Sequence, residues 1–249
     1  MDGRAVDLRE IEDGVVQITM QDRDGKNTFT PALTSGLIDA FGTVARHPEW
    51  RCVVLTGYDS YFASGGSKPA LLSLQRGEGS FADSNLYSLA LDCEVPVISA
   101  MQGHGIGGGF VMGLYADFVV LSRQAVYTTN FMKYGFTPGM GATYILRRKL
   151  GLALAQEMLL GAENFRGAVL ERRGVPFPVL PQAEVLPHAY TMARSVAAKP
   201  RNALVALKRH LVAPLRDDLP GVIAQEVAMH RETFHDPEVE TRIATMFGR

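Results

Sequence analysis

The feature that most constrains the fold is an alternation of short apolar runs with helical segments in the first half of the chain. Apolar runs at residues 14–22, 51–57, 95–101 and 116–122 have the length of β-strands. The segment at 30–47 begins with threonine and proline and then carries apolar residues at helical spacing. The run RCVVLTG at 51–57 is almost continuously apolar, as expected for a parallel strand covered on both faces. The alternation therefore predicts an α/β fold with crossover helices.

The second half of the chain has a mostly helical pattern. Only a short apolar stretch around residues 175–180 interrupts it, and no repeat or low-complexity linker divides the chain. We therefore expect an α/β core over residues 1–190 and a C-terminal helical region over residues 191–249. The expected helices lie at residues 152–160, 183–198, 201–210, 219–235 and 237–246.

Charge and cysteine content exclude several classes of function. The net charge of -1 gives no electrostatic reason to expect nucleic acid or an anionic membrane as a partner. No apolar run approaches the roughly 20 residues of a membrane span, and the N-terminal stretch MDGRAVDLRE does not have the pattern of a signal peptide. A cytoplasmic protein is therefore expected. Cys52 and Cys93 lie in or beside apolar runs, which favours buried thiols over a disulfide or a metal site.

A glycine-rich motif lies between an apolar strand and an apolar helix. Gly103, Gly105 and Gly108 form G-x-G-x-x-G. A dinucleotide site also needs an acidic residue about 20 positions further on, to bind the ribose. No Asp or Glu occurs between Asp117 and Glu157, and no Gly-Lys-Ser/Thr follows the motif as a P-loop would require. The motif therefore does not indicate a nucleotide-binding site.

The same glycines suit an oxyanion. Glycine lets backbone N–H groups approach a ligand closely, and the first N–H groups of a helix lack internal partners. An oxyanion hole usually takes two such donors from separate segments. A second glycine turn, YFASGGSK at residues 61–68, follows the apolar run at 51–57. The two turns together predict an oxyanion hole, with simple turn geometry as the alternative.

Three motifs in order resemble the crotonase (enoyl-CoA hydratase and isomerase) superfamily. They are YFASGG, MQGHGIGGGFVMGLYADFVVLS and FTPGMGATYILRRKLG. The resemblance covers nearly the whole chain and implies an α/β crotonase-type spiral of ββα units, assembled as a homotrimer or a dimer of trimers. It assigns the oxyanion hole to the backbone N–H groups of Gly66 and Gly108. Residues 191–249 would serve oligomerisation and cover the active site.

Two positions depart from the hydratases of this superfamily. Hydratases carry one glutamate three positions after the second oxyanion glycine and another shortly before the Pro-Gly-x-Gly segment. Val111 and Phe131 stand at the matching positions. Both acid/base carboxylates are thus replaced by apolar side chains of the expected substrate pocket. Water addition lacks its catalysts, whereas decarboxylation forms an enolate without a base.

The chain also resembles the crotonase-like decarboxylases of polyketide β-branching. The stretches LDCEVPVISAMQGHGIGGGFVMGLYADFVVLS, NFMKYGFTPGMGAT and KPRNALVALKRHL carry this resemblance. It implies decarboxylation of a 3-methylglutaconyl-type chain to 3-methylcrotonyl, with the chain carried on an acyl carrier protein. The phosphopantetheine arm, or CoA, is then part of the substrate, and no other cofactor or metal is implied.

That subgroup uses a histidine and a lysine at the reacting end of the chain. His230, in QEVAMHRETFHD, matches the histidine position and is a plausible proton donor near neutral pH. Spacing alone favours a packed or capping histidine on an amphipathic helix, so this alternative stays open. In a packed histidine, truncation lowers stability but spares activity.

The lysine has no clear counterpart. Leu74 and Ser80 occupy the positions where the resemblance implies it. Lys68, Arg76 and Lys133 are cations nearby in sequence, and surface charge is the simplest interpretation of each. We assign Lys68 as the candidate, which leaves a variant activity open.

Other functions remain to be distinguished. An enoyl-thioester isomerase needs only a proton shuttle, and a hydratase needs the carboxylates that are absent here. A non-catalytic crotonase-fold protein that binds acyl thioesters would explain the missing carboxylates and lysine. It would not require two oxyanion turns or His230.

Overall fold

A six-stranded sheet forms the centre of the molecule in the computed structural model, which describes residues 4–248. Its strand order is β1-β2-β3-β5-β7-β10. The pair β1–β2 is antiparallel and the other neighbours are parallel. The strands are β1 (Val6–Glu12), β2 (Val15–Met20), β3 (Cys52–Thr56), β5 (Val97–Met101), β7 (Phe118–Ser122) and β10 (Val179–Leu180).

A second sheet of very short strands lies beside the first. Its order is β4-β6-β8-β9, and the strands are β4 (Tyr61–Ala63), β6 (His104–Ile106), β8 (Val126–Thr128) and β9 (Phe165–Arg166). Each of the successive pairs β3/β4, β5/β6 and β7/β8 places one strand in each sheet before the chain turns into a helical segment. This repetition is the predicted crotonase-type spiral of ββα units, which is confirmed.

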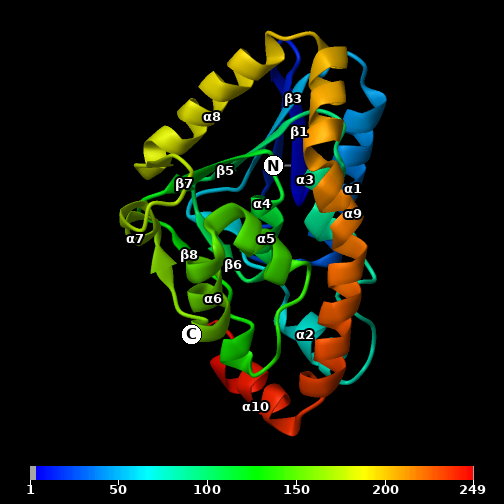
Figure 1. The fold of residues 1–249 in the computed structure, drawn as a ribbon, viewed down its shortest axis with the longest axis vertical. Helices are drawn as coiled ribbons and strands as arrows, with labels where there is room; N and C mark the ends of the chain where they lie inside the picture. The colour runs from blue at the N-terminus through cyan, green and yellow to red at the C-terminus, as the bar shows by residue number, and fades with distance from the viewer. Residues whose placement is uncertain (1–3, 249) are drawn as a thin grey trace.

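Helices cover both faces of the larger sheet (Figure 1). Helix α1 (Pro31–Arg46) begins where the Thr30 hydroxyl accepts a hydrogen bond from Leu33 N–H, and proline stands at its first position. On the opposite face, α8 (Gln182–Ala197) buries a stripe of small residues against β3, β5 and β7. The small side chains of this stripe, including Ala189 and Ala193, let α8 lie close to the sheet.

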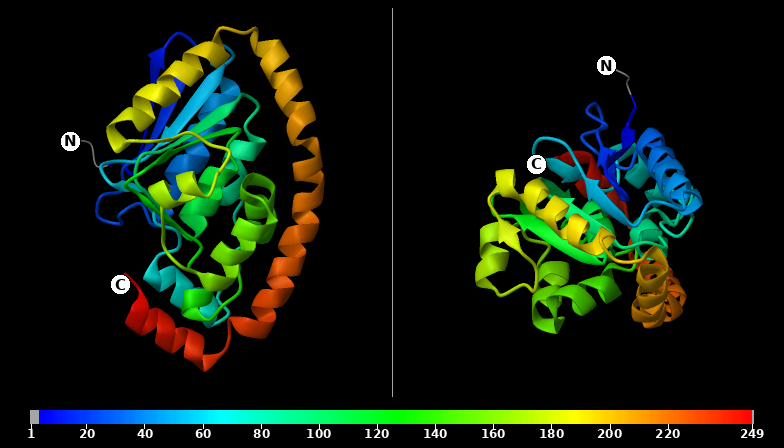
Figure 2. Two further views of the ribbon diagram at one scale, coloured as in Figure 1. Left: turned by 60° about the vertical axis from the view of Figure 1, so that its left-hand side comes forward. Right: turned by 90° about the horizontal axis from the view of Figure 1, so that it is seen from above.

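The longest helix, α9 (Arg201–Thr233), runs along one side of the molecule and leads to α10 (Pro237–Met246) (Figure 2). Two separate helices at 201–210 and 219–235 were expected, and this prediction is wrong. Pro214 and Pro220 lie inside the continuous helix. Both prolines are exposed, so water can pair with the carbonyls that lose an N–H partner.

One buried and two partly buried cations attach α9 to the core. The ammonium Nζ of Lys208 lies 2.7 Å from the Asp117 carboxylate and donates to the carbonyls of Ala90 and Val95. Two arginines of the same helix also donate to core carbonyls, Arg201 to Trp50 and Arg216 to Leu91.

The remaining elements connect these layers. They are α2 (Lys68–Gln75), η1 (Leu86–Ser88), α3 (Leu89–Asp92), α4 (Gly108–Leu114), η2 (Met132–Tyr134), α5 (Ala142–Leu150), α6 (Leu152–Gly161) and α7 (Gly167–Arg172). The division expected between residues 190 and 191 falls inside α8, and the two-region organisation stays a prediction. Cys52 and Cys93 are buried free thiols, as expected. Within residues 4–248 no helix is long and apolar enough to cross a membrane.

Candidate active site

The two glycine turns meet at the carboxyl ends of neighbouring strands. Strands β4 and β6 are parallel, with Ala63 paired to Gly105, so the residues that follow them emerge side by side. Gly65 has φ +72°, a conformation that favours glycine. A Cβ on Gly65 would lie 2.8 Å from the Ile106 carbonyl oxygen and 3.1 Å from the Gly108 nitrogen. The first turn is therefore packed directly against the second.

Gly66 and Gly108 both line one cavity of about 610 Å³. Within the described part of the chain, neither N–H group donates a hydrogen bond to a protein acceptor. Gly108 is the first residue of α4, where backbone N–H groups lack an intrahelical partner. A Cβ at Gly108 would lie 2.6 Å from the Met140 sulfur and 2.9 Å from the Phe29 ring. Two residues whose N–H groups have no acceptor in the described part of the chain thus line the same cavity, and their role as an oxyanion hole stays a prediction.

The inner wall of this cavity is apolar. Phe131 lines it and is only 5% exposed. Val111 is completely buried in α4 and does not line this cavity. Its expected contact with the substrate stays a prediction. Among the described lining residues, the only carboxylate is that of Asp24, which is exposed. The side chains that close the inner end are Leu71, Phe81, Phe131, Phe136 and Met140.

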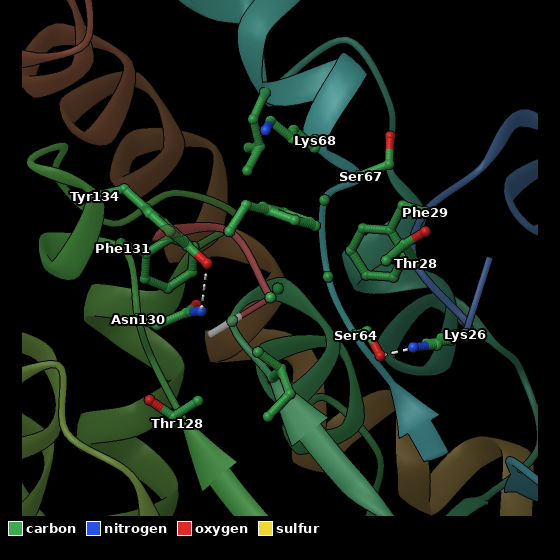
Figure 3. A pocket seen from close by; sticks show the side chains of 18 of the residues that line it. Lys26, Thr28, Phe29, Ser64, Ser67, Lys68, Thr128, Asn130, Phe131 and Tyr134 are labelled. Carbon is green, nitrogen blue, oxygen red and sulfur yellow. Dashed lines mark hydrogen bonds between the residues drawn. The ribbon is translucent and has the colours of Figure 1, made fainter. Parts of the chain in front are cut away.

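Polar groups also line the cavity, and Figure 3 labels several of them. The Asn130 amide donates to the Tyr134 hydroxyl at 3.4 Å, and the Ser64 hydroxyl donates to the Lys26 carbonyl at 2.6 Å. The Thr128 hydroxyl is buried without a hydrogen-bond partner in the described part of the chain. The cavity therefore has polar lining groups as well as apolar ones.

Lys68 lies at the start of α2 and lines the same cavity (Figure 3). Its ammonium Nζ donates to the Ala244 carbonyl of α10 at 2.7 Å. This contact links α2 to α10 and uses one of the three donors of the lysine. The catalytic role expected for Lys68 stays a prediction.

His230 is held firmly in α9. Its Nε2 lies 2.8 Å from the Thr137 carbonyl oxygen. Its ring packs in a tilted arrangement on Phe81 and edge-on to Phe234, with ring centroids 5.0 and 5.7 Å away. A Cβ at Gly139 would lie 2.6 Å from this ring. Burial lowers the pKa of His230 below its ordinary value, so the neutral ring predominates near pH 7.

His230 has features of both a packed histidine and a residue at a cavity, the two interpretations that its sequence context allows. It is a packed side chain, 9% exposed, and it also lines a smaller cavity next to the main one. Phe81 lines both cavities and stands between them. Truncation of His230 would remove these ring contacts and lower stability, whether or not the residue also delivers a proton. Its role as proton donor stays a prediction.

Glu226, a buried carboxylate of α9, is a residue of the site that the sequence analysis did not identify. Its oxygens accept hydrogen bonds from the N–H groups of Gly141 and Thr143 at 2.7 and 2.9 Å, and from the Thr143 hydroxyl at 2.6 Å. Burial raises its pKa, although these hydrogen bonds favour the charged form. Glu226 and His230 are four residues apart and share one face of α9, which could have marked them as a pair.

The loop that Glu226 holds carries Met140 into the main cavity. Met140 has φ +63°, which is costly for a residue with a side chain, by about 1–3 kcal/mol. The Tyr115 hydroxyl donates to the Met140 carbonyl at 3.1 Å, and Glu226 binds the next N–H group along the chain. These contacts keep the Met140 side chain against Gly108.

The sequence of this chain is similar to a known family and to known proteins. The enoyl-CoA hydratase/isomerase family model matches residues 10–247. The chain is 63% identical to the bacillaene synthase decarboxylase PksI of Bacillus subtilis over 243 residues, 98% of each chain. It is 28% identical to a probable enoyl-CoA hydratase of Rhodobacter capsulatus over 237 residues, 90% of this chain and 87% of the other.

Solved structures agree with these relationships. One, from work on a dehydratase/decarboxylase enzyme couple in polyketide β-branching, is 62% identical and superimposes with a TM-score of 0.98 over 98% of this chain and 100% of the other. The ECH2 decarboxylase domain of CurF from Lyngbya majuscula is 48% identical, with a TM-score of 0.94 over 98% of this chain and 100% of the other.

Proposed function

Because this chain belongs to the enoyl-CoA hydratase/isomerase family, we propose that it decarboxylates a 3-methylglutaconyl-type thioester to 3-methylcrotonyl thioester in polyketide β-branching. The observation that carries the proposal is the pair of open N–H groups, at Gly66 and Gly108, in a cavity whose inner wall is apolar. The 63% identity to a polyketide-synthase decarboxylase supports the same activity over hydration.

The two N–H groups act on the thioester carbonyl. When the bond between the distal carbon and the carboxyl carbon breaks, its electron pair passes through the conjugated chain to the thioester oxygen. The product of this step is CO2 and a dienolate. The N–H groups of Gly66 and Gly108 bind the oxygen more strongly as it gains charge, and each such donor contributes about 10²–10³-fold in rate.

The apolar wall favours this step over hydration. Phe131 stands where a hydratase carboxylate is expected, so no side chain at that position activates water. A carboxylate is poorly solvated among aromatic and aliphatic side chains, whereas CO2 is neutral and loses little there. The apolar lining therefore suits the neutral product CO2 better than the carboxylate.

A proton must then reach the terminal carbon of the dienolate. His230 supplies it in this proposal. The hydrogen bond of Nε2 to the Thr137 carbonyl fixes the neutral tautomer with its proton on Nε2, so Nδ1 is the atom that gains and delivers a second proton. Phe81 stands between His230 and the main cavity, so delivery requires a shift of this ring or a relay through water.

The carrier and the assembly belong to the same proposal. An acyl carrier protein presents the substrate, and its phosphopantetheine arm enters the polar part of the cavity near Lys26 and Ser64. The electrons released go to the thioester itself, so the reaction needs no further cofactor. A cytoplasmic homotrimer or dimer of trimers is proposed. Exposed apolar side chains such as Leu160, Leu207 and Leu211 support subunit contacts.

The activity is tested with 3-methylglutaconyl carried on an acyl carrier protein and with the same group on CoA. Mass spectrometry of the thioester should show loss of CO2, with faster turnover on the carrier protein. Crotonyl-CoA, offered in parallel, should gain little water. Gain of water by either substrate without loss of CO2 would reject the proposal.

A further inference from the structure

The substrate carboxylate lacks a cation at the inner end of the main cavity. The need for such a cation rests on the proposed function, in which this carboxylate is the group that is lost as CO2. The residues that close this end are all apolar, and an unpaired carboxylate among them would be strongly disfavoured. Lys68 is engaged with the Ala244 carbonyl, Lys26 lies on the polar side beside Ser64, and Lys133 is not free either.

A smaller cavity of about 230 Å³ adjoins this end. Phe81 lines both cavities, and its ring centroid lies 5.0 Å from that of His230 and 6.1 Å from that of Phe136. None of the described residues that line the smaller cavity is acidic, and three are basic. The lining residues are Leu74, Gly77, Gly79, Ser80, Phe81, Val227, His230, Arg231, Phe234 and His235.

The three basic side chains differ in their partners. His230 is tied to the Thr137 carbonyl, and Nδ1 of His235 is tied to the Gln75 carbonyl at 2.8 Å. Arg231 is exposed and makes no hydrogen bond or ion pair within residues 4–248. Its guanidinium keeps all its donors available, in the planar arrangement that matches a carboxylate.

We propose that Arg231 binds the distal carboxylate of the substrate at the edge of Phe81. Leu74 and Ser80, where the lysine of related decarboxylases is expected, line the same cavity without supplying a charge. Arg231 supplies that charge from α9, one residue from His230. The carboxylate and the proton donor are thereby brought to the same end of the acyl chain.

The chemistry defines what Arg231 contributes. The bond to the carboxyl carbon breaks, its electron pair passes to the thioester oxygen, and the carboxylate becomes neutral CO2. Arg231 therefore binds the reactant and releases the product, which stabilises the ground state and not the transition state. Its loss should raise KM and should not lower kcat, because the bound reactant is no longer stabilised relative to the transition state.

The test compares Arg231→Gln, Arg231→Lys and the control Arg76→Gln. Arg76 belongs to the neighbouring segment, pairs with Glu78 and lines neither cavity. For decarboxylation, Arg231→Gln should raise KM about 10–100-fold, as expected for a lost charge-assisted hydrogen bond. Arg231→Lys should restore part of this loss, and Arg76→Gln should behave as the wild type.

Binding of two unreactive thioesters on the same carrier protein separates the outcomes. Arg231→Gln should weaken binding of 3-methylglutaryl, which keeps the carboxylate, and leave binding of 3-methylcrotonyl unchanged. Equal losses for both thioesters, or none for either, would overturn the role of Arg231. If the wild type releases no CO2 but still prefers 3-methylglutaryl through Arg231, the proposed function fails and this assignment stands. Binding of neither thioester by the wild type would overturn both.

Discussion

The substitution Gly65→Ala tests how closely the two glycine turns must approach. The new methyl group would lie 2.8 Å from the Ile106 carbonyl oxygen and 3.1 Å from the Gly108 nitrogen. Both distances are shorter than the 3.4 Å at which ordinary contact begins. Since both neighbours are backbone atoms, they cannot rotate away as a side chain would. The second turn must therefore move relative to the first.

The expected effect has two parts. Alanine at φ +72° costs about 1–2 kcal/mol in the left-handed region, and a chain of this length loses roughly 2–4 °C in Tm for each kcal/mol. Displacement of Gly108 misaligns one of the two donors, which should lower the turnover of decarboxylation by about 10²–10³-fold. KM should change less, because the donors bind the transition state more strongly than the substrate.

The control is Gly174→Ala. Gly174 has φ +73°, almost the same as Gly65, and nothing lies within 4 Å of its Cβ position. This variant should lose similar stability through backbone strain and keep wild-type turnover. Turnover is followed by mass spectrometry of the carrier-bound chain, and stability by thermal unfolding. A folded Gly65→Ala variant with the turnover of the Gly174→Ala control would refute the argument that the two turns form one oxyanion hole.

Three further substitutions probe the helix that crosses the site. Glu226→Gln should turn an amide donor toward an N–H group such as that of Gly141 and lower stability by about 1–3 kcal/mol in urea unfolding; unchanged stability would contradict this. His230→Gln should lower turnover by about 10²–10⁴-fold; a destabilised but fully active variant would show that His230 only packs. Folding lowers the pKa of His230, so the folded state favours the neutral ring. The contribution of this residue to the free energy of unfolding is therefore complete above pH about 6.5 and is lost as the pH falls through the folded-state pKa. The glutamine variant should lack this pH dependence of stability. Lys208→Met should leave the Asp117 carboxylate without its buried partner and lower stability by about 3–5 kcal/mol; a loss below 1 kcal/mol would show that Asp117 is satisfied by water.

Much of the fold follows from the sequence because its signals are local. The apolar run at β3 and the Thr30-Pro31 start of α1 each predict an element within a few residues. The smaller sheet gives no such signal, since its strands have two or three residues and cannot show a period. Its existence was implied only by the resemblance to the crotonase superfamily. The continuity of α9 through Pro214 and Pro220 depends on contacts from distant parts of the chain, which a local pattern does not contain.

The candidate site divides in the same way. Gly66 and Gly108 could be proposed because glycine turns are visible in sequence, and the structure places them in one cavity. Glu226 and Arg231 belong to a helix whose sequence is rich in charged residues, as in helices at a protein surface, where charged side chains are ordinarily solvated. Only the packing of α9 against the 137–143 loop and against the segment that carries Phe81 gives them a role. Such roles depend on pairs of residues far apart in the chain.

The central claim is that the site forms a dienolate by loss of CO2 and then protonates it. The direct measurement is one turnover of carrier-bound 3-methylglutaconyl in deuterated water that also contains heavy oxygen. Mass spectrometry of the thioester should show the loss of CO2, one deuterium on the new methyl group, and no heavy oxygen. Heavy oxygen in the chain with the carboxyl group retained would contradict the account.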